Sequence, residues 1–454
     1  TRDSFTATSN QTSFATSGYT PNFLDVFLNG VKLAAADYTA SNGSDVVLAT
    51  GATTGDILEV VAYTNFDTAN VTGAANFTVT GNLSVDGGTI KLDGNYPVGN
   101  YNVALGDTAL DNGSFSGANN VAVGNASMSA TTSGNFNASV GAFSLKLNTT
   151  GSSNTAFGSG SLENNTTGSS NVGLGTSALV SNTTASDNTA VGASALAANT
   201  TGTRNVGVGK QALLVATTGN DNVAVGFVAA DSLTTASNTT AIGSWALAGN
   251  TTGANNTGIG YRALYLNTTA SNNTAVGHGA VYSNTTGAGN TGIGGEAGLS
   301  LTTSSYNTAL GFRALKLTTT ASNNTAVGTF ALQANTTGAS NVAVGGYSLL
   351  SNTTASNNTA VGYQAGYSNT TGAQNVAVGN AAFLDNTTGN YNTSLGTFAL
   401  TNNTTASNNS AIGYSTLSAN TTGASNTAVG HQALQANTTA SHNTAVGYQA
   451  GYSN

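Results

Sequence analysis

N-T-A-V-G-H-Q-A-L-Q-A-N-T-T-A-S-H, residues 426–442, is a seventeen-residue unit that the chain repeats without interruption. The next copy begins at Asn443, and counting back by seventeen returns to the same point of the unit as far as Asn120. Twenty copies in register therefore cover residues 120–454. A fixed period of this length predicts a solenoid, in which each coil packs only against its neighbours.

Two places depart from this register. Thr239 occupies the first position of its copy, where the other copies have asparagine. An imperfect copy, N-V-A-L-G, begins at Asn102, one residue out of phase with the rest. We number the positions of the repeat from 1, the asparagine that opens each copy, to 17.

Position 5 is glycine in all twenty copies. A side chain is excluded there either by a positive φ angle or by close approach of another backbone segment. We therefore expect the coil to turn a corner at this position. Representative corner glycines are Gly124, Gly192, Gly260, Gly328, Gly396 and Gly447.

Positions 2 to 4 have the composition of a short strand. Position 4 is always a sizeable apolar residue, position 2 is mostly Val or Thr, and position 3 is only Ala, Gly or Ser. Positions 2 and 4 share one face of a strand and position 3 has the other. We expect the bulky face to fill the coil and the small face to meet a second wall, in a flat coil or on another chain. The candidates for trimer contact or close packing are Ala122, Ala156, Gly173, Ala190, Gly207, Ala224, Gly258, Ala275, Ala326, Ala377 and Ala445.

The rest of the copy supplies a thin core and a turn. Position 9 is usually Leu, and N-T-T begins at position 12 in fourteen copies, as at Asn148 and Asn437. Asn and Thr favour tight turns, and stacked Asn residues form amide ladders. With about 4.8 Å between coils, the repeats predict a rod of about 95 Å. The N-T-T triplets are also formal N-glycosylation motifs, but a repeated turn explains their spacing without a glycan.

The residues before the repeats predict a small antiparallel domain. Asn29-Gly30 lies between L-D-V-F-L and V-K-L, which is a strong signal for a two-residue hairpin. Close turn signals and short alternating runs favour a sandwich or barrel. The expected strands are 5–8, 12–15, 45–48 and 57–63.

The expected fold is therefore all-β, with a sandwich-like attachment domain at 1–66 and a β connector or shaft at 67–101. A long parallel β-solenoid or β-roll of seventeen-residue repeats follows at 102–454, and we expect three chains to form a homotrimer. The last copy stops after twelve residues with no capping repeat. Because solenoids need a cap, we expect the chain to continue beyond residue 454.

Composition argues against several classes of function. Charged residues make up only 6% of the chain, the net charge is −8, and there are no cysteines. With nine Lys and Arg residues, no basic patch is visible, so we expect no nucleic-acid partner. No apolar run is long enough to span a membrane, and none of the motifs indicates a cofactor.

Catalysis and metal binding are not expected either. The three histidines, His278, His431 and His442, occupy variable positions with no carboxylate placed to pair with them. Carboxylates occur singly among the repeats, whereas a calcium-binding repeat would place Asp in every coil. We therefore expect a protein that is not an enzyme.

Two surface features remain open. Aromatic residues could stack on sugars, although packing along the rod is favoured because they do not recur at one position; they are Tyr261, Tyr265, Tyr282, Phe312, Tyr363, Tyr367, Tyr448 and Tyr452. Regular Thr ladders on a flat solenoid could bind ice, which is a distant third hypothesis.

The core N-V-A-V-G or N-T-A-V-G resembles the head-domain repeat of trimeric autotransporter adhesins. The resemblance covers 120–454 and implies a left-handed parallel β-roll with small position-3 residues near subunit contacts. Two features differ: the period here is a uniform seventeen residues, and we expect no membrane anchor or signal segment within these residues.

The series from Phe5 to Tyr63 is similar to a module of tail fibres of marine and cyanobacterial phages, and N-F-T-V-T-G-N-L-S-V-D-G (76–87) is similar to their shaft segments. This resemblance implies a homotrimer attached to other virion tail or baseplate proteins through its N-terminal domain, with host-receptor binding, including glycans, towards the C-terminus. The hypothesis is a virion tail-fibre protein. The alternative is a bacterial trimeric surface adhesin or extracellular filament subunit.

Overall fold

The computed structural model describes residues 1–63 and 101–453. They belong to two units, one on each side of residue 90, and each unit is described by itself. The predicted connector at 67–101 lies, apart from Tyr101, outside the described residues, as do the last three residues of the predicted attachment domain.

The N-terminal unit consists of two small antiparallel sheets. One has the order β1-β7-β3-β4 and the other the order β2-β6-β5. The strands are β1 (Arg2–Thr6), β2 (Gln11–Ala15), β3 (Leu24–Leu28), β4 (Val31–Lys32), β5 (Tyr38–Thr39), β6 (Asp45–Ala52) and β7 (Ile57–Ala62). Phe14 and Val46 of the second sheet share a buried core with Val26, Leu58 and Val60 of the first. This arrangement confirms the predicted antiparallel β-domain.

The hairpin signal in this unit was also right. β3 and β4 pair antiparallel around Asn29-Gly30, with Leu28 opposite Val31. Asn29 and Gly30 have φ angles of 48° and 80°, as a two-residue turn with two positive φ values requires. The first strand was predicted too late, at 5–8, because polar residues at its start obscure the alternation.

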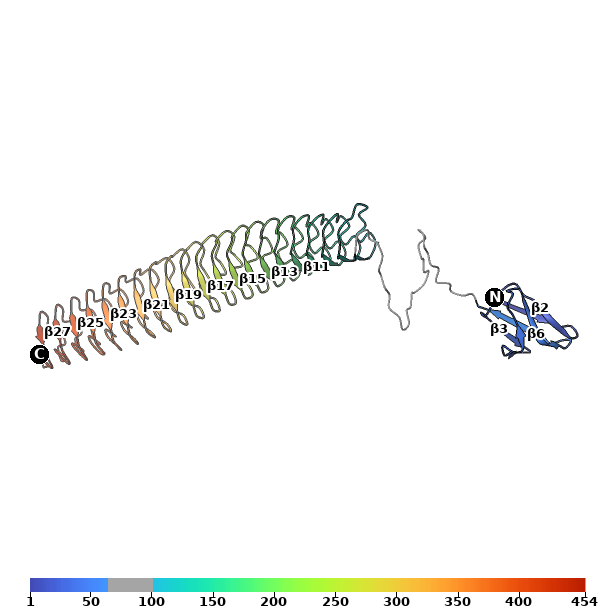
Figure 1. Cartoon of the computed structure of the whole chain (residues 1–454). Coiled ribbons are helices and arrows are strands. Elements are labelled where there is room, and N and C mark those ends of the chain that lie inside the picture. The colour runs from blue at the N-terminus through green and yellow to red at the C-terminus, as the bar shows by residue number, and fades with distance from the viewer. Residues whose placement is uncertain (64–100, 454) are drawn as a thin grey trace. The chain divides into compact units, whose positions relative to one another are not determined.

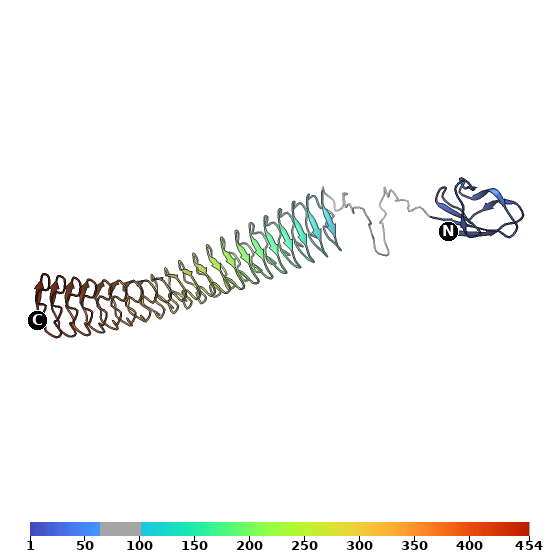
Figure 2. The ribbon, with the colours of Figure 1, turned by 90° about the horizontal axis from the view of Figure 1, so that it is seen from below.

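The repeat unit is a parallel β-solenoid with one three-residue strand per coil, which confirms the predicted fold (Figures 1 and 2). The strands pair in sequence order from β8 to β28, and Figure 1 places β11 and β27 near opposite ends of the stack. Their bounds are β8 (Val103–Leu105), β9 (Val121–Val123), β10 (Ala138–Val140), β11 (Thr155–Phe157), β12 (Val172–Leu174), β13 (Thr189–Val191), β14 (Val206–Val208), β15 (Val223–Val225), β16 (Thr240–Ile242), β17 (Thr257–Ile259), β18 (Thr274–Val276), β19 (Thr291–Ile293), β20 (Thr308–Leu310), β21 (Thr325–Val327), β22 (Val342–Val344), β23 (Thr359–Val361), β24 (Val376–Val378), β25 (Thr393–Leu395), β26 (Ser410–Ile412), β27 (Thr427–Val429) and β28 (Thr444–Val446).

Hydrogen bonds between coils extend well beyond the strands. At the strand, the Thr155 amide donates to the Asn171 carbonyl at 2.8 Å, and on another side the Leu162 amide donates to Ala178 at 2.9 Å. At the N-T-T turn, the Thr166 amide donates to the Thr183 carbonyl at 2.8 Å. Each coil is therefore fixed to its neighbours around its whole circumference.

Position 3 faces the inside of the coil, which corrects the expected orientation of the strand. Ala156 is fully buried within its own chain, and a Cβ atom added to Gly173 would lie 2.5 Å from Ser161 Oγ and 3.4 Å from Leu162 Cδ1. The residues are small because the interior is narrow and is already occupied by position 9. The structure therefore fits the close-packing alternative, in which these side chains pack inside their own coil, and contact with a partner chain stays a prediction that nothing tests. Among the candidates, Ala445 in the last described coil is only partly buried, and the other ten are buried.

Positions 2 and 4 consequently face outward. The strand burial patterns show no buried residue at position 4 in any of the twenty copies. The prediction that bulky β-branched residues fill the coil is wrong for the same reason. The interior is instead formed by Ala and Leu at positions 8 and 9 together with buried asparagines.

The corner glycines meet both conditions inferred from the sequence. Gly260 has a φ angle of 130°, and a Cβ atom added there would lie 2.6 Å from the Gly277 carbonyl oxygen of the next coil. Non-glycine residues also adopt the left-handed conformation, at positions 7, 9 and 17; in one coil these are Phe143, Leu145 and Ser153, with φ angles of 60°, 49° and 60°. Each such residue costs about 1–2 kcal/mol. The ladders between coils must offset this cost.

Candidate functional site

Two buried asparagine ladders hold the coils in register. In the position-1 ladder, the side-chain oxygen of one asparagine accepts the backbone amide of the asparagine seventeen residues later, as from Asn205 N to Asn188 Oδ1 at 2.9 Å. In the position-12 ladder, side-chain amides bond directly, as from Asn182 Nδ2 to Asn165 Oδ1 at 2.7 Å. Satisfied amides of this kind rigidify an interior, because any shift leaves buried polar groups without partners.

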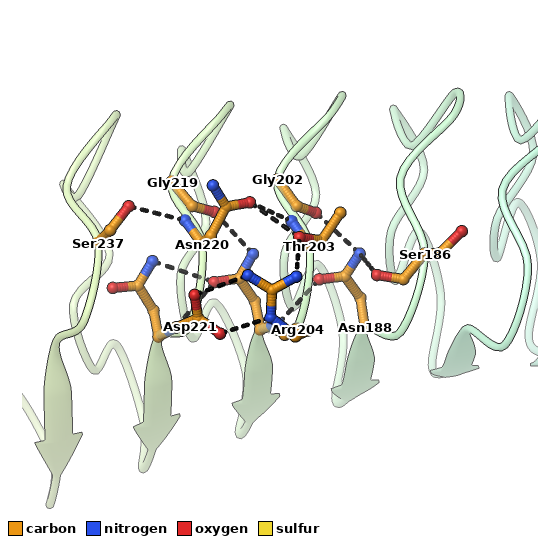
Figure 3. A network of polar contacts seen from close by, with 11 residues as sticks. Ser186, Asn188, Gly202, Thr203, Arg204, Gly219, Asn220, Asp221 and Ser237 are labelled. Carbon is orange, nitrogen blue, oxygen red and sulfur yellow. Dashed lines mark hydrogen bonds and ion pairs between the residues drawn. The ribbon is translucent and has the colours of Figure 1, made fainter.

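The two ladders meet at the carbonyl of position 15. Gly202 O accepts a hydrogen bond from Asn188 Nδ2 at 2.9 Å (Figure 3). It accepts another from Asn199 Nδ2 at 3.0 Å. The asparagine of the N-T-T triplet is thus a core residue. Asn199 is fully buried, so the folded coil does not present it to a glycosylating enzyme. The sequence predicted a tight turn with an amide ladder here; the ladder is confirmed, and the burial of its asparagine was not anticipated.

The position-1 ladder is interrupted at Thr239. Thr239 N still donates to Asn222 Oδ1 at 3.0 Å, but its own hydroxyl lies 3.5 Å from the Ser237 carbonyl. Within the part of the chain that the structure describes, the buried Asn256 backbone amide has no hydrogen-bond acceptor. The ladder resumes at Asn273, whose amide donates to Asn256 Oδ1 at 2.9 Å.

Outside the coil, positions 2 and 4 form a face along the sheet, which we call the outer sheet face; position 4 is apolar in every copy, and position 2 is Thr in twelve copies and Val in six. It consists of the side chains at repeat positions 2 and 4 of every copy between residues 120 and 446. Its position-4 side chains include Phe157, Ile242, Leu310 and Leu395, which are about two-fifths exposed. A row of partly exposed apolar side chains that recurs in every coil is a candidate interaction surface.

A charged clip lies on another side of the stack. Arg204 and Asp221, both at position 17, form a two-pronged ion pair between adjacent coils, with distances of 2.6 Å from Nε to Oδ1 and 2.8 Å from Nη2 to Oδ2 (Figure 3). The Arg204 hydrogen bond lowers the pKa of the Asp221 carboxyl. Both groups are exposed to solvent, so the pair contributes little to stability but supports the alignment of the coils.

Threonines line the turn side in two parallel rows. The Thr149 hydroxyl at position 13 donates to the Thr166 carbonyl of the next coil at 3.0 Å, and this bond recurs along the stack. Thr150 and its counterparts at position 14 are exposed. One row therefore strengthens the stack, and the other presents regularly spaced hydroxyl and methyl groups to solvent.

Aromatic side chains stack between successive coils more regularly than the sequence indicated. Tyr414, His431 and Tyr448 occupy position 6 of consecutive copies, with ring centroids 5.1 and 5.3 Å apart and interplanar angles of 20° and 21°. Numbering by repeat position would have revealed this alignment. Two of the three histidines, His278 and His431, thus lie in aromatic stacks.

The remaining chemical groups are dispersed. Within residues 1–63 and 101–453, no three His, Asp or Glu side chains gather closely enough to hold a metal ion. Burial raises the pKa of the Asp231 carboxyl. None of the described elements is a helix long and apolar enough to cross a membrane. No family model, curated protein or solved structure matches the chain.

Proposed function

We propose that this chain is a structural fibre protein of a phage tail, a rigid trimeric spacer that carries host-receptor attachment. The observation that best supports the proposal is the outer sheet face, where an unbroken row of apolar position-4 side chains, flanked by Thr and Val at position 2, is partly exposed along the described solenoid. A spacer needs stiffness along its axis and a surface for assembly, and the repeat has features suited to both.

Stiffness would come from the ladders. Each coil is bonded to the next through its strand, its turns and its buried asparagines, for example through Asn188 and Asn199. Opening one joint would leave several buried donors and acceptors without partners, each costing about 1–3 kcal/mol. Reach then grows by about 4.8 Å per added copy, without any change in the joint.

Assembly would use the outer sheet face and not position 3. Covering the position-2 and position-4 side chains with the same strip of two further chains would remove a long apolar surface from water. Burial of apolar area contributes about 25 cal/mol per Å². Small gains at each coil would add up over the length of the stack.

Paired cysteine variants test this assembly, since the natural chain has no cysteine. Val276, at position 4 of β18, is partly exposed, whereas its neighbour Ala275 is fully buried. Val276→Cys should be shielded from maleimide in the native assembly and become reactive when the assembly is dissociated. If the Val276→Cys thiol reacts freely in the native protein, the outer sheet face is not an interface. Ala275→Cys, the matched control, should stay protected in both states.

The N-terminal unit would attach the fibre to tail or baseplate proteins, and the site of action would be the virion. The test is immunogold electron microscopy of phage particles that contain this chain, with antibodies raised against residues 1–63. Gold at the base of extended fibres supports the proposal. Gold on bacterial cell surfaces in the absence of phage would instead favour the runner-up, a trimeric surface adhesin or extracellular filament subunit.

A third candidate function, ice binding, is also testable. The exposed Thr150 row recurs at position 14 of successive coils and resembles a regular hydroxyl and methyl lattice. Ice binding would require thermal hysteresis in solution. Its absence at millimolar protein would dispose of this function and leave the fibre proposal intact.

A further inference from the structure

A hollow of about 310 Å³ lies on the solenoid surface between positions 6–7 and positions 10–11 of consecutive coils. It forms around Gly279, where position 7 lacks a side chain. A Cβ atom added to Gly279 would meet only Leu299, at 3.5 Å. The neighbouring position-7 residues, Arg262 and Glu296, line opposite sides of the gap. The volume is at the lower end of the range for small-ligand sites.

Two aromatic stacks contribute to this hollow. Tyr261 and His278, at position 6, stack with centroids 5.5 Å apart and an angle of 16°. Tyr265 and Tyr282, at position 10, stack with centroids 5.2 Å apart and an angle of 22°. Tyr261, His278 and Tyr282 line the hollow directly. Such side chains offer apolar contact area together with a hydroxyl that can form hydrogen bonds.

Arg262 provides an unused charge at this place. Its guanidinium carbon lies 5.1 Å from the Tyr261 ring centroid and 5.3 Å from that of Tyr265, so the aromatic rings fix its position. Its Nε atom is buried and has no hydrogen-bond partner among the described residues. The side chain as a whole is only partly buried and lines the hollow, so its charge is available to a ligand there.

The local charge favours an anion. Between Asp231 and Asp385 the sequence contains one carboxylate, Glu296, and three cations, Arg262, Arg313 and Lys316, although the whole chain has a net charge of −8. Glu296 is already paired with Arg313 Nε and Lys316 Nζ, at 2.8 Å each. These two bonds lower the pKa of Glu296, so its charge is held and compensated. Arg262 is left to attract a ligand.

We propose that this hollow binds a carboxylated sugar unit of an acidic polysaccharide. Arg262 pairs with the carboxylate, which matches the planar fork of its guanidinium. Tyr261 and Tyr282 contact the sugar ring, and the hydroxyls of Ser283 and Ser300, which also line the hollow, bond to sugar hydroxyls. The choice of a polysaccharide rests on the proposed role in host attachment, whereas the preference for an anion follows from the charges.

Isothermal titration calorimetry of the full chain tests the proposal with a hexamer of galacturonic acid, with maltohexaose and with inorganic phosphate. The acidic hexamer should bind, and both other probes should bind at least about tenfold more weakly, a difference of about 1.4 kcal/mol. Arg262→Gln removes the charge and should weaken binding by at least the same factor.

Gly279→Gln is the second variant, because it fills the hollow and leaves every charge in place. Glutamine already occupies position 7 at Gln364, with a φ angle of 55°, close to the 60° of Gly279, so the backbone accepts it. Lys210→Gln, at an exposed position 6, is the control that removes one charge elsewhere. It should bind like the natural chain.

Three results would overturn the proposal: no binding of the acidic hexamer at millimolar concentration, equal binding of either other probe, or unchanged binding in Gly279→Gln. Circular dichroism of each variant confirms folding beforehand. Failure here would not affect the fibre proposal, which depends on the oligomeric state and on the reactivity of Val276→Cys.

Discussion

Replacing Thr239 by asparagine should close a break in the position-1 ladder and stabilise the solenoid. The new side-chain oxygen would accept the buried Asn256 amide, which lacks an acceptor among the described residues. Its side-chain amide would reach the Gly253 carbonyl, as Asn188 Nδ2 reaches Gly202 at 2.9 Å. Satisfying one buried donor is worth about 1–3 kcal/mol, and we expect a net gain within that range.

Hydrogen exchange measured at single amides is the most direct assay for this change. Since 1.4 kcal/mol corresponds to a factor of ten, the Asn256 amide should exchange about 5- to 150-fold more slowly in Thr239→Asn. Asn188→Thr is the matched reverse variant, because it removes the acceptor that Asn205 N uses at 2.9 Å. The Asn205 amide should then exchange faster by a similar factor.

The ladder account would be refuted by unchanged exchange at Asn256 in a Thr239→Asn variant that remains folded. Thermal unfolding gives a second readout, in which Thr239→Asn should melt above the natural chain and Asn188→Thr below it. Because contacts in a repeat array are between neighbours, the exchange effects should be confined to coils next to the substitution.

The remaining predictions concern the corner, the outer sheet face and the charged clip. Gly260→Ala should lower the free energy of unfolding in chemical denaturation by about 3 kcal/mol or more, because strain at positive φ adds to a backbone overlap. Gly279→Ala, where only the strain applies, should lower it by about 1–2 kcal/mol. Similar costs for the two variants would contradict the corner assignment. Val276→Lys should leave the circular dichroism of the coil unchanged but raise the protein concentration at which the assembly dissociates in gel filtration. An unchanged dissociation midpoint would count against the outer sheet face. In a carbon-detected NMR titration, Asp221 should titrate below the ordinary aspartate range and return to it in Arg204→Gln. Because the pKa of Asp221 is lowered in the folded chain, the ion pair contributes to stability above the ordinary aspartate pKa, and this contribution is lost as the pH falls through the lowered value. A normal titration midpoint for Asp221 in the natural chain would show that the charged clip does not form in solution.

The sequence was sufficient for the period, the corner and the antiparallel hairpin. The geometry at Gly260 explains why position 5 is always glycine: no other residue tolerates both that φ angle and that close approach of the next coil. The hairpin at Asn29-Gly30 could be predicted because its turn type requires positive φ angles, which Asn and Gly adopt most easily. These features depend on local backbone geometry, which residue identity determines directly.

The orientation of the strand could not be settled in the same way. A face limited to Ala, Gly and Ser fits equally well against a partner chain or inside a narrow coil. Size variation does not separate the two, because the interior position 9 also varies in size, from Gly366 to Phe383. The buried asparagines explain the observed orientation, because Asn199 and Asn188 occupy interior space that a bulky apolar face would need.

The left-handed residues at position 17 had a sequence signal, since this position is Asn, Asp or Gly in nine copies, whereas those at positions 7 and 9 had little. Leu145 has a φ angle of 49° although leucine does not favour this region, and the surrounding ladder imposes the conformation. The hollow at Gly279 was also hidden, because it requires knowing which side chains of successive coils lie side by side. These side chains become neighbours only when the coils stack, so the sequence of a single copy does not show the hollow.

The mass of the intact chain in solution tests the central claim most directly. Sedimentation equilibrium at low micromolar concentration should give three times the chain mass of 44.6 kDa, with no smaller species. A stable species of 44.6 kDa would contradict the trimeric fibre and leave the outer sheet face without its proposed occupant.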